Sequence, residues 1–257
     1  MIGAIAGDII GSPFEFKPHK SVDFPLFGPG CRFTDDTVLT VALAEAIMHD
    51  KDYCQLLKQY GRTYPNAGYG GTFVKWMMLE STEPYFSFGN GSAMRTSPVG
   101  FYYKTLEEVL AKAEVYANVT HNHPEGLKGA QATAAAVFMA RNGGSKEDIR
   151  RYITETFGYN LTRTCDQIRP SYQFDVTCQG SVPEAIICFL ESTDFESAVR
   201  LAVSLGGDSD TQACIAGGIA EAMYGVPEWI AEKALGYLDE ELLTVQQVFL
   251  SFCEEGL

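Results

Sequence analysis

The sequence lacks a long apolar segment and has few basic residues. No stretch of about 18 apolar residues without a charge occurs in its 257 residues, so we expect no membrane-spanning helix. Residues 1–4 carry no basic leader and Asp8 interrupts the first apolar run, so we expect no signal peptide. Lys and Arg number 19 against 33 Asp and Glu, which gives a formal net charge of −14. General binding to nucleic acids or acidic membranes is therefore not expected, because it needs clustered Lys and Arg.

The cysteines lack the spacing of a disulfide framework. Their number, seven, is odd, and no C-x-x-C pair occurs. We therefore predict free thiols and a protein of the reducing cytoplasm. The residues concerned are Cys31, Cys54, Cys165, Cys178, Cys188, Cys214 and Cys253.

Several segments carry the signals of helix starts. Residues 105–108 have the pattern of a capping box, and residues 145–148 are a weaker version of it. Asp194 can cap a helix over residues 195–205. Pro227 suits the first position of a further helix.

The remaining patterns favour helices over strands. Two alanine-rich segments, 128–141 and 212–223, fit helices that pack closely, because small side chains let backbones approach. Residues 171–179 are the best candidate for a strand, with an extended loop as the alternative. No repeat or linker divides the chain and no heptad pattern persists. We therefore predict one all-α globular domain over residues 1–257 that is not a coiled coil.

Two segments combine paired aspartates with threonine at the start of an apolar helix. The first is T-D-D-T at residues 34–37, and the second is G-G-D-S-D-T at residues 206–211. Helix capping explains one such cluster, because Asp and Thr oxygens accept hydrogen bonds from free N–H groups in the first turn. Because two clusters of the same composition occur, we expect a functional site there in addition to helix caps.

The chemistry of these clusters favours hard divalent cations. Carboxylate and hydroxyl oxygens suit Mg²⁺, Mn²⁺ or Ca²⁺ and disfavour a Cys/His zinc site. Four carboxylates in one pocket would repel one another unless cations were present. If the clusters meet in space, two divalent ions would balance their charge. Such ions would also let an anionic ligand approach a protein of net charge −14.

Two other interpretations of the second cluster fail on their context. An EF-hand loop starting at Asp208 needs an acid or Asn, Gly and Glu where the chain has Gln212, Ala213 and Ile219. The D-x-D-x-T pattern of haloacid-dehalogenase-type phosphatases is one residue out of register at Thr211 and normally begins a chain.

Two loop-like segments are candidates for ligand binding. Glycine and asparagine in residues 87–95 tolerate left-handed backbone angles, so successive N–H groups can form a nest for phosphate, and Phe88 offers a ring face to a base. An ordinary Asn-Gly turn is the alternative. In residues 120–124, His121 and His123 lie in a loop, where a hydrogen bond to ligand or backbone is favoured over zinc binding.

Together these motifs resemble the ADP-ribosylglycohydrolases, the relatives of the dinitrogenase-reductase-activating glycohydrolase. The resemblance follows the family's order and spans residues 3 to about 225. The motifs are G-D-x-x-G at residues 7–11 with Glu15, T-D-D-T at 34–37, G-N-G-S-A-M-R at 89–95, T-H at 120–121 and G-G-D-S-D-T at 206–211.

The resemblance implies an all-α fold of the ADP-ribosylglycohydrolase type, two Mg²⁺ or Mn²⁺ ions, and removal of ADP-ribose from a modified side chain. By motif, the implied metal ligands are Thr34, Asp35, Asp36, Asp208, Asp210 and Thr211. The implied contacts to ADP-ribose are Ser87, Phe88, Gly89, Asn90, Gly91 and His121. Catalytic roles are expected for Glu15, Asp35, Asp36 and Asp210, with Glu15 or a freed aspartate as general acid or base.

The residues around Glu15 also predict its backbone conformation. Pro13 restricts the residue before it, so the first helix ends by then. Phe14 and Phe16 flank Glu15, and we expect an extended segment whose apolar neighbours are held in the core.

The expected substrate is an ADP-ribosylated protein or a small ADP-ribosyl compound, with ADP-ribose as the product. Arginine-linked ADP-ribose is the first choice, ahead of serine-linked ADP-ribose, ADP-ribose polymer and small metabolites. The alternatives are a catalytically silent ADP-ribose-binding scaffold and a metal-dependent phosphatase or pyrophosphatase. The chain is shorter than many members of the family, so loops that select the target protein are expected to be missing.

Overall fold

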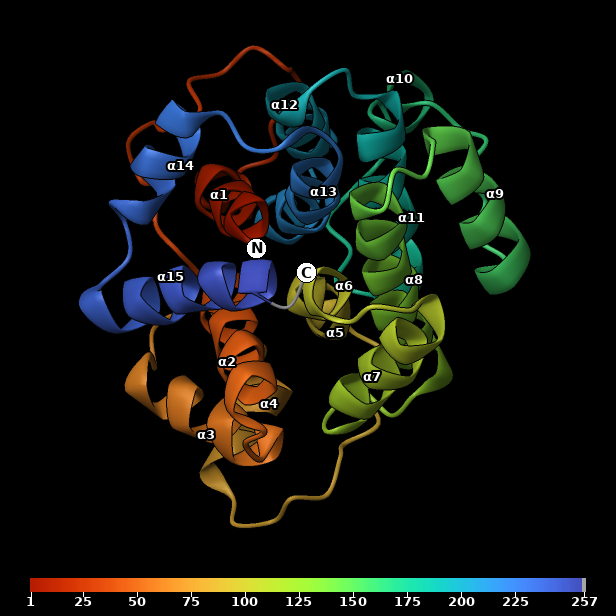
Figure 1. The fold of residues 1–257 in the computed structure, drawn as a ribbon. Coiled ribbons are helices and arrows are strands. Elements are labelled where there is room, and N and C mark those ends of the chain that lie inside the picture. Colours follow the sequence, from red (N-terminus) through yellow and green to blue (C-terminus); the bar gives the residue numbers. More distant parts are fainter. Residues whose placement is uncertain (256–257) are drawn as a thin grey trace.

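The computed structural model describes residues 1–255, and within this range the chain is an array of helices without a strand (Figure 1). The predicted all-α fold is confirmed. The elements are α1 (Ile2–Gly11), the 3₁₀ helix η1 (Ser12–Phe14), α2 (Asp35–His49), α3 (Tyr53–Thr63), α4 (Gly71–Met78), α5 (Gly91–Met94), α6 (Ser97–Tyr102), α7 (Leu106–Asn118), α8 (Pro124–Arg141), α9 (Lys146–Phe157), α10 (Cys165–Ile168), α11 (Cys178–Glu191), α12 (Phe195–Ser204), α13 (Ser209–Tyr224), α14 (Glu228–Leu235) and α15 (Glu240–Glu255).

The helix starts follow the local signals. Capping boxes at Thr105 and Ser145 open α7 and α9, as predicted. Asp194 caps α12, as predicted, and forms a capping box with Ser197. Pro227 is the N-cap of α14 and not its first residue, so that prediction was one position off. All seven cysteines are free thiols, as expected.

The candidate strand at residues 171–179 does not form, and residues 172–176 are a loop, which was the alternative. Its end is already helical, because α11 begins at Cys178. The segment before it pairs with the chain around Gly89 through one isolated antiparallel bridge, Gly89 to Thr177. Two hydrogen bonds hold this contact, from the Asn90 N–H to the Val176 carbonyl (2.8 Å) and from the Cys178 N–H to the Phe88 carbonyl (2.9 Å).

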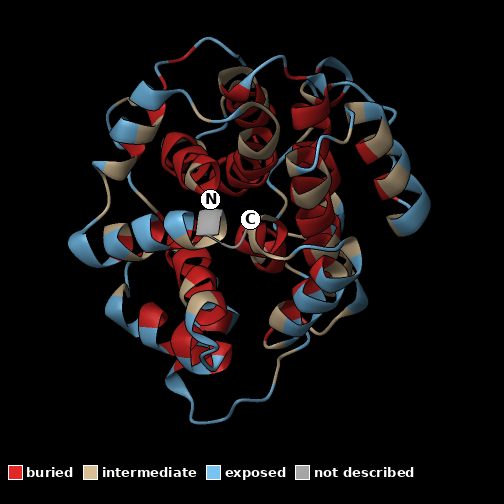
Figure 2. Cartoon of the chain, in the orientation of Figure 1, coloured by how far each residue is buried: buried red, intermediate tan, exposed pale blue. Residues whose placement is uncertain are grey.

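Helices α1 and α13 pack at very short range in the centre of the molecule (Figures 1 and 2). A Cβ atom at Gly3 would lie 2.5 Å from the Gly217 carbonyl oxygen, and one at Gly7 would overlap the Ala213 carbonyl. Only glycine permits this approach, because any side chain would push the helices apart. The contact brings Asp8 of α1 beside the start of α13.

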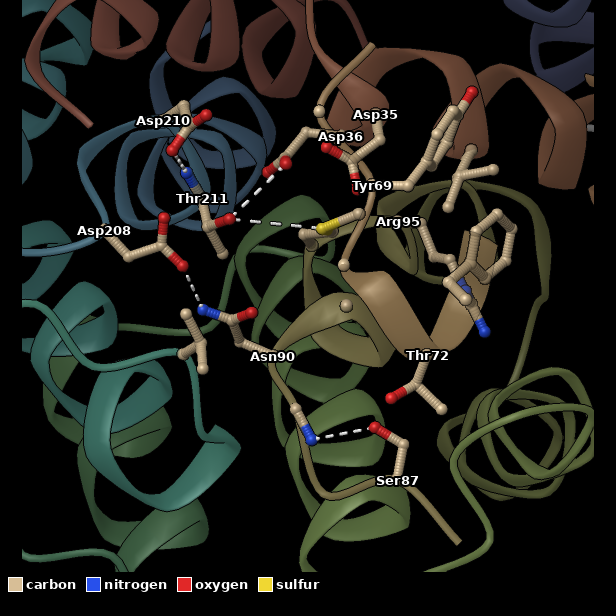
Figure 3. A pocket seen from close by; sticks show the side chains of 18 of the residues that line it. Asp35, Asp36, Tyr69, Thr72, Ser87, Asn90, Arg95, Asp208, Asp210 and Thr211 are labelled. Carbon is tan, nitrogen blue, oxygen red and sulfur yellow. Dashed lines mark hydrogen bonds between the residues drawn. The ribbon is translucent and has the colours of Figure 1, made fainter. Parts of the chain in front are cut away.

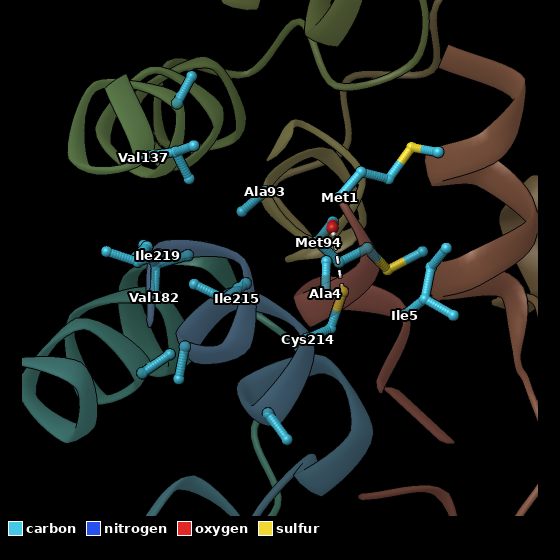
Figure 4. Packing of buried hydrophobic residues seen from close by; sticks show 14 of the residues in the cluster. Met1, Ala4, Ile5, Ala93, Met94, Val137, Val182, Cys214, Ile215 and Ile219 are labelled. Carbon is cyan, nitrogen blue, oxygen red and sulfur yellow. Dashed lines mark hydrogen bonds between the residues drawn. The ribbon is translucent and has the colours of Figure 1, made fainter. Parts of the chain in front are cut away.

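Apolar side chains from several helices complete the core around this pair. Ile5 of α1 and Ile215 of α13 are buried, and they meet Met94 of α5 and Val182 of α11 in one cluster (Figure 4). The Cys214 thiol donates to the Met94 carbonyl oxygen at 3.2 Å. The core therefore fixes α1, α5, α11 and α13 relative to one another. None of the helices between residues 1 and 255 has the length and apolar character that a membrane crossing requires.

Candidate active site

The starts of α2 and α13 meet at one cavity of about 490 Å³ (Figure 3). The two acidic clusters seen in the sequence are thus neighbours in space. Of the predicted site residues, the cavity is lined by Glu15, Asp35, Asp36, Ser87, Gly89, Asn90, Gly91, His121, Asp208, Asp210 and Thr211.

Asp8 organises the start of α2. Its carboxylate is fully buried and accepts hydrogen bonds from the Thr34 N–H (2.9 Å), the Thr34 hydroxyl (2.7 Å), the Thr37 N–H (3.1 Å) and the Thr37 hydroxyl. Thr34 is also the N-cap of α2 and accepts from the Asp36 N–H at 3.3 Å. Thr34 is therefore engaged with Asp8 and the helix start, and it is not among the residues that line the cavity.

The start of α13 is held by an amide side chain. The Asn90 Nδ2 group donates to Asp208 Oδ2 at 2.7 Å and to the Ser181 hydroxyl at 3.2 Å. The Thr211 hydroxyl donates to Asp36 Oδ2 at 3.4 Å, which links the two acidic clusters directly. Figure 3 shows Asp36, Asp208 and Asp210 turned toward the same space.

Glu15 reaches the acidic cluster from a helical turn. Its backbone is helical (φ −49°, ψ −53°), because the 3₁₀ helix η1 continues α1 past Pro13, so the expectation of an extended segment was wrong. Phe14 is packed against the core as expected, but Phe16 is exposed. The Glu15 side chain lies on the cavity beside Asp208 and Asp210.

Carboxylate oxygens converge in two sets that share one residue. One set is Asp8, Asp36 and Asp210, and the other is Glu15, Asp208 and Asp210, with one oxygen of each residue within 4.8 Å of the others. Asp36 Oδ1 is buried and has no hydrogen-bond partner. Within residues 1–255, no basic side chain forms an ion pair with any of these five carboxylates. This donor set fits hard divalent cations, whose charge would balance that of the carboxylates.

Without such cations the acids resist ionisation. Burial and the neighbouring carboxylates raise the pKa of Asp36 and of Asp210 well above the usual range. Burial and the charges of Asp8 and Asp208 raise the pKa of Asp35 to about 8. Burial and Asp208 raise the pKa of Glu15 to about 7, although Arg32 opposes the shift. In the absence of cations these carboxyl groups keep their protons, whereas bound cations would stabilise their ionised forms.

His121 presents a hydrogen-bond donor to the predicted ligand segment. The Thr120 hydroxyl accepts from Arg95 at 2.7 Å and lies 2.7 Å from His121 Nδ1. Since this hydroxyl already accepts, we assign its proton to the bond with Nδ1, which leaves the proton of the neutral ring on Nε2. Burial lowers the pKa of His121 and keeps the ring neutral. Nε2 faces the backbone at Gly91, where a Cβ atom would lie 3.2 Å away.

The segment around Gly89 differs in part from the expected nest. The Gly89 N–H donates to the Ser87 hydroxyl at 3.2 Å and the Asn90 N–H donates to Val176, so both are used within the protein. Phe88 is 45% exposed and is not among the residues that line the cavity. Its ring packs on His123, whose Nδ1 caps α8 by accepting from the Glu125 N–H at 3.0 Å.

Sequence inspection missed three groups of residues at the site. Asp8 was recognised as part of a motif and as an interruption of the first apolar run, but it was not assigned to the site. The glycine-rich segment 68–72, which leads into α4, lines the cavity and was not considered. Phe16 and Phe174 also line the cavity, from segments far apart in the chain.

The fold and the cavity define an all-α protein whose buried carboxylates suit bound cations. The model of the ADP-ribosylglycohydrolase family matches residues 1–254. The chain belongs to this family, as the motifs predicted.

Individual relatives agree with this assignment. The human ADP-ribosylhydrolase ARH3 is 28% identical over 328 residues, covering 95% of this chain and 90% of that protein. The ADP-ribosylarginine hydrolase Tri1 of Pseudomonas putida is 27% identical, covering 91% of this chain and 73% of that protein. A solved structure described as an ADP-ribosylglycohydrolase-related protein complex is 25% identical, with a TM-score of 0.74 over 100% of this chain and 97% of its own. The alignment with human ARH3 is longer than the 257 residues of this chain, so that relative carries segments that are missing here.

Proposed function

We propose that this protein is a metal-dependent hydrolase that cleaves the glycosidic bond between ADP-ribose and a modified side chain and releases ADP-ribose. Its family and its relatives support the hydrolysis of ADP-ribose linkages. The observation that carries the metal dependence is the unpartnered buried oxygen of Asp36 inside a cluster of carboxylates. The free thiols suit the reducing cytoplasm as the place of action.

The metal ligands would come from the two carboxylate sets. Asp36 and Asp210 would hold one ion, and Glu15, Asp208 and Asp210 would hold or approach the other. Asp35 and Thr211 line the same cavity and remain proposed ligands, while Asp8 fixes the start of α2. Divalent ions bound here would supply Lewis acidity and lower the pKa of a coordinated water.

The ADP-ribose would lie along the cavity from these acids toward α4. Helix α4 begins at Gly71 after Gly70, and no side chain caps it, so its first N–H groups are available for a diphosphate. The hydroxyl of Thr72 and the side chain of Ser87 lie on the same side of the cavity in Figure 3. The Nε2–H group of His121 would donate a further hydrogen bond to this part of the ligand.

Glu15 is proposed to move the proton. Hydrolysis breaks the bond from the anomeric carbon to the leaving atom, adds the water oxygen to that carbon and places a proton on the leaving group. A carboxyl at this position can donate this proton to the leaving group and then take one from water. Its position beside Asp208 and Asp210 puts it at the end of the cavity where the ribose would react.

Arginine is the proposed linkage. The relative Tri1 is named as an ADP-ribosylarginine hydrolase and aligns with 91% of this chain. A guanidinium group would also be attracted by the negative field of a protein with net charge −14.

Product analysis by mass spectrometry tests this proposal. The protein is incubated with a peptide ADP-ribosylated on arginine, with Mg²⁺ or Mn²⁺ and with a chelator. We expect release of free ADP-ribose that depends on the added metal, and a loss of about 100-fold or more in kcat for Glu15→Gln. Glu155→Gln, an exposed acid on α9, is the matched control. Release of AMP or phosphate would indicate a pyrophosphatase or phosphatase, and binding without any product would indicate a scaffold.

A further inference from the structure

Two aromatic rings stand exposed inside the cavity. Phe16 is 74% and Phe174 is 45% exposed, and both line the cavity. Their ring centroids lie 5.7 Å apart with the planes tilted by 37°. We call these two residues the aromatic shelf. Large apolar side chains that meet inside a ligand cavity and remain exposed to water are suited to contact with a ligand.

The aromatic shelf lies at the acidic end of the cavity. Phe16 directly follows Glu15, and consecutive Cα atoms are only about 3.8 Å apart. Lys20 connects the two chain segments that carry the rings. Its Nζ donates to the Tyr172 carbonyl oxygen at 2.6 Å and also to the Leu205 carbonyl oxygen. The segment after Phe16 is thereby attached to the segment before Phe174.

The opposite end of the cavity is occupied by the proposed diphosphate contacts. Figure 3 shows Asp208 and Asp210 on one side of the cavity and Thr72 and Ser87 on the other. If the ribose reacts at the acids and the diphosphate lies at α4, the substituent on the anomeric carbon leaves on the side away from α4. This placement rests on the proposed function, and it directs the leaving group toward the aromatic shelf.

We propose that Phe16 and Phe174 form the leaving-group subsite and select for an ADP-ribosylated arginine side chain. A guanidinium is flat and weakly hydrated, and it stacks on aromatic faces. Since the two rings contact each other, the guanidinium lies on their cavity-facing surfaces and not between them. The Glu15 carboxyl next to Phe16 supplies a polar partner for its N–H groups. A serine leaving group has neither a cation nor a large apolar surface, and it gains little from the shelf.

Substrate kinetics with two linkages test the selectivity. Phe16→Ala, Phe174→Ala and the double variant are compared on peptides ADP-ribosylated on arginine or on serine. We expect kcat/KM for the arginine peptide to fall roughly fivefold for each ring and about 20-fold for both, mainly through KM. Turnover of the serine peptide and the affinity for free ADP-ribose should change by less than about twofold. Phe16→Leu, which keeps apolar area but removes the ring, should behave like Phe16→Ala. Trp229→Ala removes an exposed ring outside the cavity and serves as the control.

Binding of a guanidinium probe gives a readout that does not depend on turnover. Agmatine is titrated calorimetrically into the protein saturated with Mg²⁺ and ADP-ribose. We expect binding to the wild type and to Trp229→Ala, and at least a fivefold weaker affinity in the double variant. The inference would be overturned by equal losses of activity on both peptides or by unchanged agmatine binding. A loss of ADP-ribose affinity would also overturn it, because the rings would then contact the adenine. If the wild type releases ADP-ribose from neither peptide, the proposed function fails, while the agmatine titration still tests the shelf.

Discussion

Raising the pH should destabilise the metal-free protein, and Asp35 provides the clearest case. Burial and the neighbouring Asp8 and Asp208 raise its pKa from 3.8 to about 8. In the unfolded chain this carboxyl is ionised at neutral pH, whereas the folded protein keeps its proton until the pH passes about 8. The folded state therefore binds more protons, and the stability that Asp35 contributes is lost as the pH rises through its folded pKa.

The size of the effect follows from one proton. The free energy of unfolding falls by about 1.4 kcal/mol per pH unit while the folded state holds one extra proton. Between about pH 6.5 and about pH 8 this amounts to ~2 kcal/mol as a ceiling. Asp35 lines a cavity open to water, so screening reduces the expected loss to about 1–2 kcal/mol. For a chain of this length, that corresponds to a fall in Tm of roughly 3–6 °C.

Calorimetric melting of the chelator-treated protein checks this expectation. Asp35→Asn removes one of several titrating carboxyls and should lose the share of the pH dependence that Asp35 contributes, while Glu15, Asp36 and Asp210 retain theirs. Glu155→Gln should keep the whole pH dependence. Measurements above about pH 6.5 avoid the titration of His121. Its pKa is lowered in the folded protein, so protonation of His121 on acidification would destabilise the fold. Saturating Mg²⁺ should flatten the wild-type profile, because a cation replaces the proton. Identical pH profiles for wild type and Asp35→Asn would refute the reasoning.

Three further substitutions have defined outcomes. Asp36→Asn replaces a buried carboxyl that neighbouring carboxylates keep from ionising with a neutral amide, so the metal-free variant should melt higher than wild type, and the metal-induced rise in Tm should fall by half or more. Asn90→Ala deletes the 2.7 Å bond to Asp208, and calorimetry should show about 10-fold or greater loss in Mn²⁺ or ADP-ribose affinity, since bonds to charged groups are worth about 1.5–3 kcal/mol. Gly7→Ala places a Cβ atom on the Ala213 carbonyl and should lower the free energy of unfolding by about 2–3 kcal/mol, measured by urea unfolding.

Local signals were sufficient for the helix starts and for the composition of the acidic clusters. Capping at Thr105 depends on side chains three residues apart, so the sequence alone predicts it. The meeting of the two clusters depends on the contact of Gly3 and Gly7 with α13, which is set by packing between distant segments. The sequence pattern did not predict that contact.

The errors arose where tertiary contacts decide the conformation. Glu15 was expected in an extended segment, but a 3₁₀ turn carries α1 past Pro13 and directs Glu15 toward the acids. The contact of Phe88 with ADP-ribose stays a prediction, and in the structure its ring packs on His123 outside the residues that line the cavity. In both cases the sequence offered the motif, but the orientation of the side chain depended on neighbours that are distant in the sequence.

The stoichiometry of bound Mn²⁺ tests the central claim most directly, because the proposed chemistry depends on two ions held by the buried carboxylates. Asp210 belongs to both carboxylate sets, whereas Asp36 belongs to one. Calorimetry and elemental analysis should find two Mn²⁺ per chain in the wild type, one in Asp36→Asn and none in Asp210→Asn, each variant being folded by circular dichroism. No bound Mn²⁺ in the wild type, or two ions retained by Asp210→Asn, would contradict the account.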